Sequence, residues 1–172
     1  PYTAGHQRRV SDLSRAIAQR MGLPQDQVDG VRMAGSIHDL GKIYVPSEIL
    51  NKPGKIGANE FELVKSHSQV GYDILKTITF PWPVADIELQ HHERLDGSGY
   101  PNGLKGDEIL LEARIVAVAD VVESMSSHRP YRPALGIEKA LEEIRAGRGT
   151  IFDERVVDAC LLLFEEDGYT LL

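Results

Sequence analysis

The sequence predicts an all-α fold for a chain of 172 residues. Apolar residues recur every three or four positions in several segments, which is the spacing of one face of an α-helix. No segment shows the sustained alternation of apolar and polar residues that is typical of a half-buried strand. The length, with 42% hydrophobic and 26% charged residues, is ordinary for one globular domain with a full core. We therefore expect a single helical domain over residues 1–172.

The order of the helices follows from the apolar spacing and from the residues that interrupt it. The first helix carries an apolar stripe from Val10 to Met21 and ends at Gly22. The second helix is opened by Pro24 and reaches His38, and the third runs from near Asn59 to Leu75 with His67 near its middle. The fourth is opened by Pro83 and runs into His91 and His92. A further helix spans the apolar run 115–122, and two amphipathic helices at 136–145 and 153–164 close the chain. This order places His6 and His38 near opposite ends of neighbouring helices.

Charge and cysteine content restrict the function and the compartment. The formal net charge of −7 argues against broad, non-specific binding to DNA or RNA. The chain has no apolar stretch of about 18 residues and no signal-like amino terminus, so we expect no membrane segment. Its one cysteine, Cys160, lies in an apolar run and is expected in the core of a cytoplasmic protein without disulfides.

Five of the six histidines belong, together with two aspartates, to a set that is typical of a metal site. The set comprises His6, His38, Asp39, His67, His91, His92 and Asp120. Imidazole together with carboxylate suits iron, manganese, nickel or zinc, whereas a magnesium or calcium site would be mostly oxygen. So many ligands exceed the needs of one ion. The set therefore favours two metals that share a bridging carboxylate, an arrangement that serves phosphoryl chemistry.

Single members of this set have simpler interpretations. A lone histidine on an apolar helix, such as His6 or His67, is more often a core residue than a ligand. Asp120 interrupts the apolar run from Ile115 to Val122, where an unpaired charge would be costly to bury. A metal explains this aspartate best, and a buried lysine or arginine is the alternative partner.

The irregular stretch 94–107 is expected to be functional, because a loop of this length inside a compact domain usually has a role. It holds Gly97, Gly99, Gly103 and Gly106 beside Pro101. Glycine lets the backbone approach a ligand closely, while proline fixes one joint. For Asn102-Gly103 alone, a surface turn is the better interpretation.

Two motifs resemble those of the HD-GYP family. His38-Asp39-Leu40-Gly41-Lys42 matches HDxGK, and the run from His91 to Pro101 matches HHExxDGxGYP, which is highly specific. Further agreement extends from residues 1–6 to Phe152-Asp153, so the resemblance covers essentially the whole chain. It implies a helical bundle of the HD superfamily with a glycine-rich GYP loop. Such a domain commonly forms the output end of a longer bacterial signalling protein, after a receiver or sensory domain.

The resemblance also implies an activity, cofactors and partners. The implied enzyme is a phosphodiesterase that hydrolyses cyclic di-GMP to pGpG, or onward to GMP, through a hydroxide that bridges two metals. The implied cofactors are two divalent transition-metal ions, iron or manganese first, with nickel, cobalt or zinc as alternatives. The implied partners are cyclic di-GMP, the upstream domain, and proteins that bind the GYP loop.

Matching positions assign a role to each motif residue. The histidines and aspartates named above would ligate the metals, with Asp39 as the bridge. Asp39 and Lys42 would be catalytic. The substrate contacts would come from Lys42, Arg129, Arg132, Gly99, Tyr100 and Pro101. Without the motifs, Lys42 would be taken for a solvated surface lysine. Arg129 and Arg132 could alternatively cap the carboxyl end of the preceding helix.

The chain departs from the family pattern at three positions. Tyr2 stands where some members have a glutamate that holds a third metal, which favours a two-metal centre here. Glu123 stands where the family usually has aspartate, which lengthens a side chain expected near Lys42. Leu110 replaces a frequent proline, a change expected to matter only where the loop enters the next helix.

Two rival functions stay open at this point. The domain could bind cyclic di-GMP or a partner protein without cleaving anything, although an intact ligand set disfavours this. It could instead be an HD hydrolase of another nucleotide, such as cyclic GMP-AMP, and the GYP loop says little about that alternative.

Overall fold

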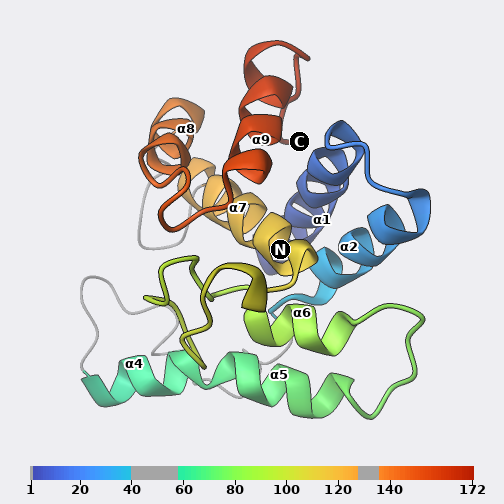
Figure 1. Ribbon diagram of the computed structural model, residues 1–172, viewed down its shortest axis with the longest axis vertical. Coiled ribbons are helices and arrows are strands. Elements are labelled where there is room, and N and C mark those ends of the chain that lie inside the picture. The colour runs from blue at the N-terminus through green and yellow to red at the C-terminus, as the bar shows by residue number, and fades with distance from the viewer. Residues whose placement is uncertain (1, 40–57, 128–135) are drawn as a thin grey trace.

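The computed structural model describes residues 2–39, 58–127 and 136–172 (Figure 1). This part of the chain is helical and contains no named strand, which confirms the expected all-α fold. The elements are α1 (Tyr2–Arg20), α2 (Gln25–Ile37), α4 (Ala58–Lys65), α5 (His67–Leu75), α6 (Val84–Gln90), a 3-10 turn η2 (Gly106–Glu108), α7 (Leu111–Ser126), α8 (Ile137–Ala146) and α9 (Glu154–Glu165).

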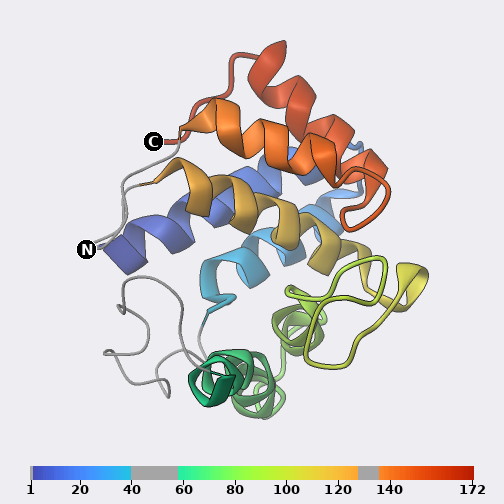
Figure 2. The same ribbon diagram turned by 90° about the vertical axis from the view of Figure 1, so that its left-hand side faces the viewer.

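The central helix of the bundle is α7, which packs against α1, α2, α6, α8 and α9. Its apolar run is almost wholly inaccessible to solvent, as the sequence predicts for a core helix. Helices α4, α5 and α6 lie together on one side of this core, apart from α8 and α9 (Figures 1 and 2). The junction between the two layers therefore brings the ends of α2 and α6 close to α7.

Close packing of α1 on α2 places the first two histidines together. A Cβ atom on Gly35 of α2 would lie only 3.0 Å from the Cα of Ser11 on α1, so glycine is what allows this approach. The rings of His6 and His38 consequently lie with their centroids 5.3 Å apart. His6 lies near the start of α1 and His38 follows the last residue of α2, so the two lie near opposite ends of neighbouring helices, as expected.

One expected helix is interrupted. The sequence pattern predicts a single helix from about residue 59 to 75, but the structure divides it into α4 and α5 at Ser66. The Ser66 hydroxyl donates to the carbonyl of Leu63 at 2.6 Å. His67 begins α5 and does not lie in the middle of a longer helix, so that detail of the prediction is wrong.

The closing helices follow the expected boundaries. Asp153 caps α9 by accepting from the backbone N–H groups of Arg155 at 2.8 Å and Val156 at 3.2 Å. Its other oxygen accepts from Arg114 of α7 at 2.6 Å, which ties α9 to the central helix. Cys160 is fully buried in α9, as expected. Among the described helices, none combines the length and the apolar character needed to traverse a bilayer.

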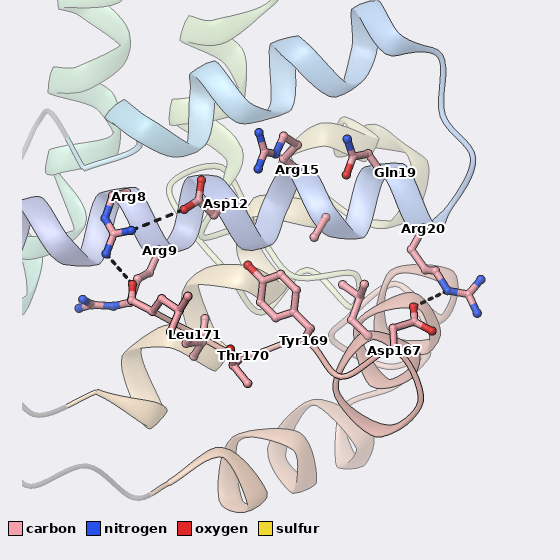
Figure 3. Close-up of a pocket in the computed structure, with 13 residues that line it drawn as sticks. Arg8, Arg9, Asp12, Arg15, Gln19, Arg20, Asp167, Tyr169, Thr170 and Leu171 are labelled. Carbon is pink, nitrogen blue, oxygen red and sulfur yellow. Dashed lines mark hydrogen bonds and ion pairs between the residues drawn. The ribbon is translucent and has the colours of Figure 1, made fainter.

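A pocket of about 630 Å³ lies between α1 and the C-terminal segment 167–172 (Figure 3). Arginines of α1 line it, and three of them form hydrogen bonds or ion pairs with other parts of the chain. Arg20 pairs with Asp167 at 2.9 Å, and Arg8 donates to the carbonyl oxygen of Leu172 at 2.5 Å. Arg9 is bound to Glu123 of α7 at 2.6 Å. These contacts hold the C-terminal segment and α7 against α1.

Candidate metal centre

One group of potential ligands lies where α1, the end of α2 and α7 meet. It consists of His6, His38, Asp39 and Asp120, whose ligand atoms all lie within 4.8 Å of one another. Nε2 of His6 lies 3.3 Å from Oδ2 of Asp39 and 3.3 Å from Oδ1 of Asp120. Nε2 of His38 lies 3.2 Å and 3.3 Å from the same two oxygens. Two imidazoles and two carboxylates thus converge on one small space.

A second group shares Asp39 with the first. Its other members are His67 at the start of α5 and His91 and His92 at the end of α6. The carboxylate turns a different oxygen to each group. Oδ1 of Asp39 lies 3.9 Å from Nε2 of His67 and 3.7 Å from Nε2 of His91. Asp39 therefore has the geometry expected of a bridging carboxylate between two sites.

Backbone carbonyls at helix ends orient two of the rings. His38 and His91 follow the last residues of α2 and α6, where carbonyls lack partners within the helix. Nδ1 of His38 lies 2.7 Å from the carbonyl of Gly35, and Nδ1 of His91 lies 2.7 Å from that of Glu88. A carbonyl can only accept, so each Nδ1 donates. This leaves Nε2 of each ring directed at the carboxylates.

Carboxylates make the first group favourable for positive charge. Burial lowers the pKa of His6, but hydrogen bonds to Asp120, Asp39 and Glu123 raise it to about 11. Burial likewise lowers the pKa of His38, but the charge of Asp39 and hydrogen bonds to both aspartates raise it to about 10. The negative charge that favours a proton on these rings also favours a divalent cation bound to them in place of that proton.

The second group contains one imidazole, that of His92, that burial keeps neutral. Burial, helped by the neighbouring His91, holds the pKa of His92 well below its usual value. Among the described residues, no hydrogen-bond partner reaches Nε2 of His91 or of His92, although both atoms are buried. Buried nitrogen atoms of this kind are costly unless something binds them. The donors in both groups, imidazole nitrogen and carboxylate oxygen, therefore fit divalent transition-metal ions.

The GYP loop, residues 94–107, is hydrogen-bonded to the segment that carries the pair His91 and His92. Glu93 is buried, and its carboxylate accepts from the backbone N–H groups of Asn102 at 2.8 Å and Leu104 at 3.0 Å. The ring of Tyr100 stacks on that of His92, with centroids 4.8 Å apart. The loop is thus held over one edge of the second group by the residue that follows the two histidines.

Gly99 serves the packing of the loop on its own chain. A Cβ atom there would lie 2.3 Å from the carbonyl oxygen of His92 and 2.5 Å from the amide nitrogen of Arg94. The sequence suggested that glycines in this loop allow a ligand to approach the backbone. At this position the close approach is instead made by the backbone of the histidine segment.

The three departures from the family pattern are described to different extents. Leu110 precedes α7, and its backbone N–H donates to Oε1 of Gln90 at 2.7 Å, a bond that a proline could not make. Tyr2 begins α1, but its side chain lies outside the described part. Glu123 contacts His6, Arg9 and Ser127. Its expected neighbour Lys42 lies outside the described residues, as do Arg129 and Arg132.

Sequence reasoning did not assign the contacts of Glu93 and Glu123, although it named Glu123 as a departure from the family pattern. Both are nearly or fully inaccessible to solvent. A signal was present for each, because Glu93 follows the histidine pair directly and Glu123 interrupts the same apolar helix as Asp120. The rule that made Asp120 a candidate, that an acidic residue in an apolar run needs a partner, applies equally to Glu123.

The chain belongs to the HD-domain family, which matches residues 1–156. The cyclic di-GMP phosphodiesterase response regulator RpfG of Xanthomonas campestris is 45% identical over 161 residues, which are 92% of this chain and 43% of that protein. The 3'3'-cGAMP-specific phosphodiesterase 3 of Vibrio cholerae is 39% identical over 153 residues, 89% of this chain and 33% of that protein. These matches confirm the resemblance to HD-GYP proteins. The chain spans less than half the length of these curated relatives.

A solved structure shows the same fold. Bd1817, described as an HDG"Y"P protein from Bdellovibrio bacteriovorus, matches with a TM-score of 0.78 at 20% identity. The match covers 95% of this chain and 52% of that protein. The arrangement of the helices is therefore shared with that structure.

Proposed function

We propose that this domain is a metal-dependent phosphodiesterase that hydrolyses cyclic di-GMP to linear pGpG, with onward cleavage to GMP as a second step. The observation that carries the proposal is the position of Asp39, which turns one oxygen to each of two ligand groups. Paired sites of this kind act on both the attacking and the leaving oxygen of a phosphate ester. The name and the 45% identity of the RpfG relative support cyclic di-GMP as the substrate.

The proposed ligands are the full set named from the sequence: His6, His38, Asp39, His67, His91, His92 and Asp120. Two divalent ions held by them, iron or manganese in the first instance, would acidify a water molecule and draw charge from a phosphate diester. The side chains themselves set the geometry. Asp39 fixes the separation of the two groups, while the carbonyls behind His38 and His91 fix which ring nitrogen faces inward.

The proposed substrate contacts rest on the motif matches. Lys42 would neutralise charge that accumulates on the phosphate, and Arg129 and Arg132 would hold the nucleotide or its phosphates. Tyr100 and Pro101 would form a wall beside the second ligand group. The stacking of Tyr100 on His92 supports this placement, because it puts the tyrosine ring next to a proposed ligand.

The proposed setting is the cytoplasm, as the output domain of a longer signalling protein. The description of RpfG as a response regulator, together with its greater length, supports an upstream receiver or sensory domain. The GYP loop is the proposed contact for partner proteins. The hydrogen bonds between Glu93 and the backbone of this loop support the proposal, because a loop held in one conformation presents a defined surface.

The test is an assay of purified, manganese-loaded or iron-loaded protein with three substrates. We expect cyclic di-GMP to yield pGpG, with GMP appearing later, and a chelator to abolish the reaction. Faster cleavage of cyclic GMP-AMP would change the assigned substrate and keep the reaction class, an outcome to which the Vibrio cholerae relative gives weight. Binding of cyclic di-GMP without any linear product over hours would reject the enzyme in favour of a receptor, and faster cleavage of a deoxynucleoside triphosphate would indicate another HD hydrolase.

A further inference from the structure

We propose that Glu123, held in place by Arg9 and Ser127, is a positioning residue that fixes the ring of His6 with its Nε2 facing Asp39 and Asp120. The inference rests on the proposed function in one respect, namely that His6 ligates a metal. It assigns a role to the position at which this chain carries glutamate and the HD-GYP pattern usually has aspartate.

Each oxygen of Glu123 has defined partners. The side chain is completely buried in α7. Oε1 lies 2.5 Å from Nδ1 of His6. Oε2 accepts from Nε of Arg9 at 2.6 Å and from the hydroxyl of Ser127 at 2.5 Å. A buried carboxylate with such contacts on both oxygens has one stable orientation, and it transmits that orientation to the histidine.

The contact determines which nitrogen of His6 can bind a metal. An ionised carboxylate only accepts hydrogen bonds, so the hydrogen must be on Nδ1 of His6. Nε2 is then the ring atom that can present a lone pair. It lies 3.3 Å from oxygens of both Asp39 and Asp120, at the centre of the first ligand group.

His6 needs this support more than the histidines at helix ends do. His38 and His91 each reach a carbonyl three residues back, which the end of the helix leaves available. His6 lies within α1, where the preceding carbonyls are used by the helix itself. Its orienting group must therefore come from another helix, and Glu123 of α7 supplies it from 117 residues away in the sequence.

The length of glutamate is what allows both contacts. Arg9 lies on α1 three residues after His6, about one helical turn away. The carboxylate of Glu123 must therefore reach from α7 to side chains on two adjacent turns of α1. Aspartate would withdraw the carboxylate by one carbon–carbon bond, about 1.5 Å. That displacement exceeds the tolerance of a hydrogen bond of this length. We therefore expect aspartate at position 123 to lose the contact with His6.

The main experiment compares Glu123→Gln with Glu142→Gln in protein loaded with zinc, which is diamagnetic. Glutamine keeps the shape but has one acceptor oxygen, so it cannot accept from both His6 and Arg9. Two zinc ions should bind each chain, one more weakly than the other. In Glu123→Gln we expect the affinity for the more weakly bound ion, measured by competition with a chromophoric chelator, to fall roughly 10-fold to 100-fold. Glu142 is an exposed residue of α8 that pairs with Lys139, so its variant should bind zinc like the wild type.

Nitrogen-15 spectra of the His6 ring give a readout that a general loss of stability would not produce. In the zinc-loaded wild type we expect the proton on Nδ1 and none on Nε2. A proton on Nε2 in the wild type would overturn the proposal without any variant. A Glu123→Gln protein with wild-type zinc affinity and with the same His6 ring-nitrogen spectrum as the wild type would also overturn the proposal.

A second variant covers the case in which Glu123→Gln does not fold. Glu123→Asp keeps the charge in the core and is expected to fold, with zinc affinity reduced and the His6 ring no longer in a single form. Wild-type affinity in this variant would contradict the argument from side-chain length. None of these measurements needs catalysis. A wild type that binds zinc with the expected His6 pattern, but cleaves no cyclic dinucleotide when loaded with manganese or iron, would reject the proposed function and leave the role of Glu123 intact.

Discussion

Oδ1 of Asp39 lies 3.7 Å from Nε2 of His91, across the junction between the end of α2 and the end of α6. The other oxygen of Asp39 faces the histidines of α1 and α2. One carboxylate thus connects the two layers of the fold as well as the two ligand groups. Metal binding and the docking of the α5–α6 layer on the core are therefore expected to be coupled.

The first prediction concerns this bridge. Asp39→Ala should release or misplace both ions, because both groups lose their shared ligand. Phosphodiesterase activity should fall at least ~10³-fold, since the metals are needed to activate water. The measurement is initial rate against metal content, with Asp73→Ala, an exposed carboxylate of α5, as the matched control. Near-normal turnover by Asp39→Ala would exclude the two-metal mechanism.

The second prediction is the number of ions. We expect elemental analysis to give two transition-metal ions per chain, one for each ligand group. Tyr2 stands where some family members have a third-metal glutamate, and a phenol with a pKa of ~10 is a poorer ligand than a carboxylate. Three tightly held ions, or a third anomalous peak beside Tyr2, would contradict the prediction.

The third prediction concerns Gly99. A methyl group there would meet backbone atoms of His92 and Arg94, which cannot move aside as a flexible side chain could. Gly99→Ala should therefore lower the free energy of unfolding by roughly 1–3 kcal/mol and displace Tyr100 from His92. Asn102→Ala, which changes an exposed side chain of the same loop, should stay within about 0.5 kcal/mol of the wild type. Equal stability of the two variants in urea would be inconsistent with the described loop packing.

The fourth prediction is a pH dependence of stability due to Cys160. Burial raises the pKa of this thiol from 9.0 to about 12. The folded state therefore keeps its proton at pH values where the unfolded state has lost it, and stability should decline as the pH rises from about 9 toward 12. Urea unfolding of Cys160→Ala should lack this part of the decline. Rapid reaction of the native wild type with a thiol reagent at neutral pH would argue against the burial of Cys160.

The residues named from the sequence as candidate ligands lie together in two groups, and chemistry limits the choice of residue at each of them. Histidine and carboxylate together suit the metals concerned, and the apolar surroundings of Asp120 gave a second signal. The sequence did not predict the partner of His6. That partner depends on how α1 crosses α7, a matter of packing between positions 117 residues apart. The break at Ser66 was also not predicted, because apolar residues recur at helical spacing on both sides of it.

The last prediction concerns Glu93, whose two oxygens hold the backbone of the GYP loop. In Glu93→Gln one oxygen becomes an NH2 group that faces a partly buried backbone N–H donor, so one bond is lost and that donor loses its partner. The cost should be about 1–3 kcal/mol of unfolding free energy. Because the ligand groups do not include Glu93, metal content should stay at the wild-type level while KM for the dinucleotide rises.

Glu108→Gln is the matched control for this change. Oε1 of Glu108 also accepts from a loop N–H, that of Lys105 at 2.8 Å, but this contact is exposed and water can replace it. Its effect on stability should therefore be within about 0.5 kcal/mol. Loss of metal from Glu93→Gln would mean that Glu93 supports the histidine pair directly, and an unchanged KM would mean that the GYP loop does not contact the substrate.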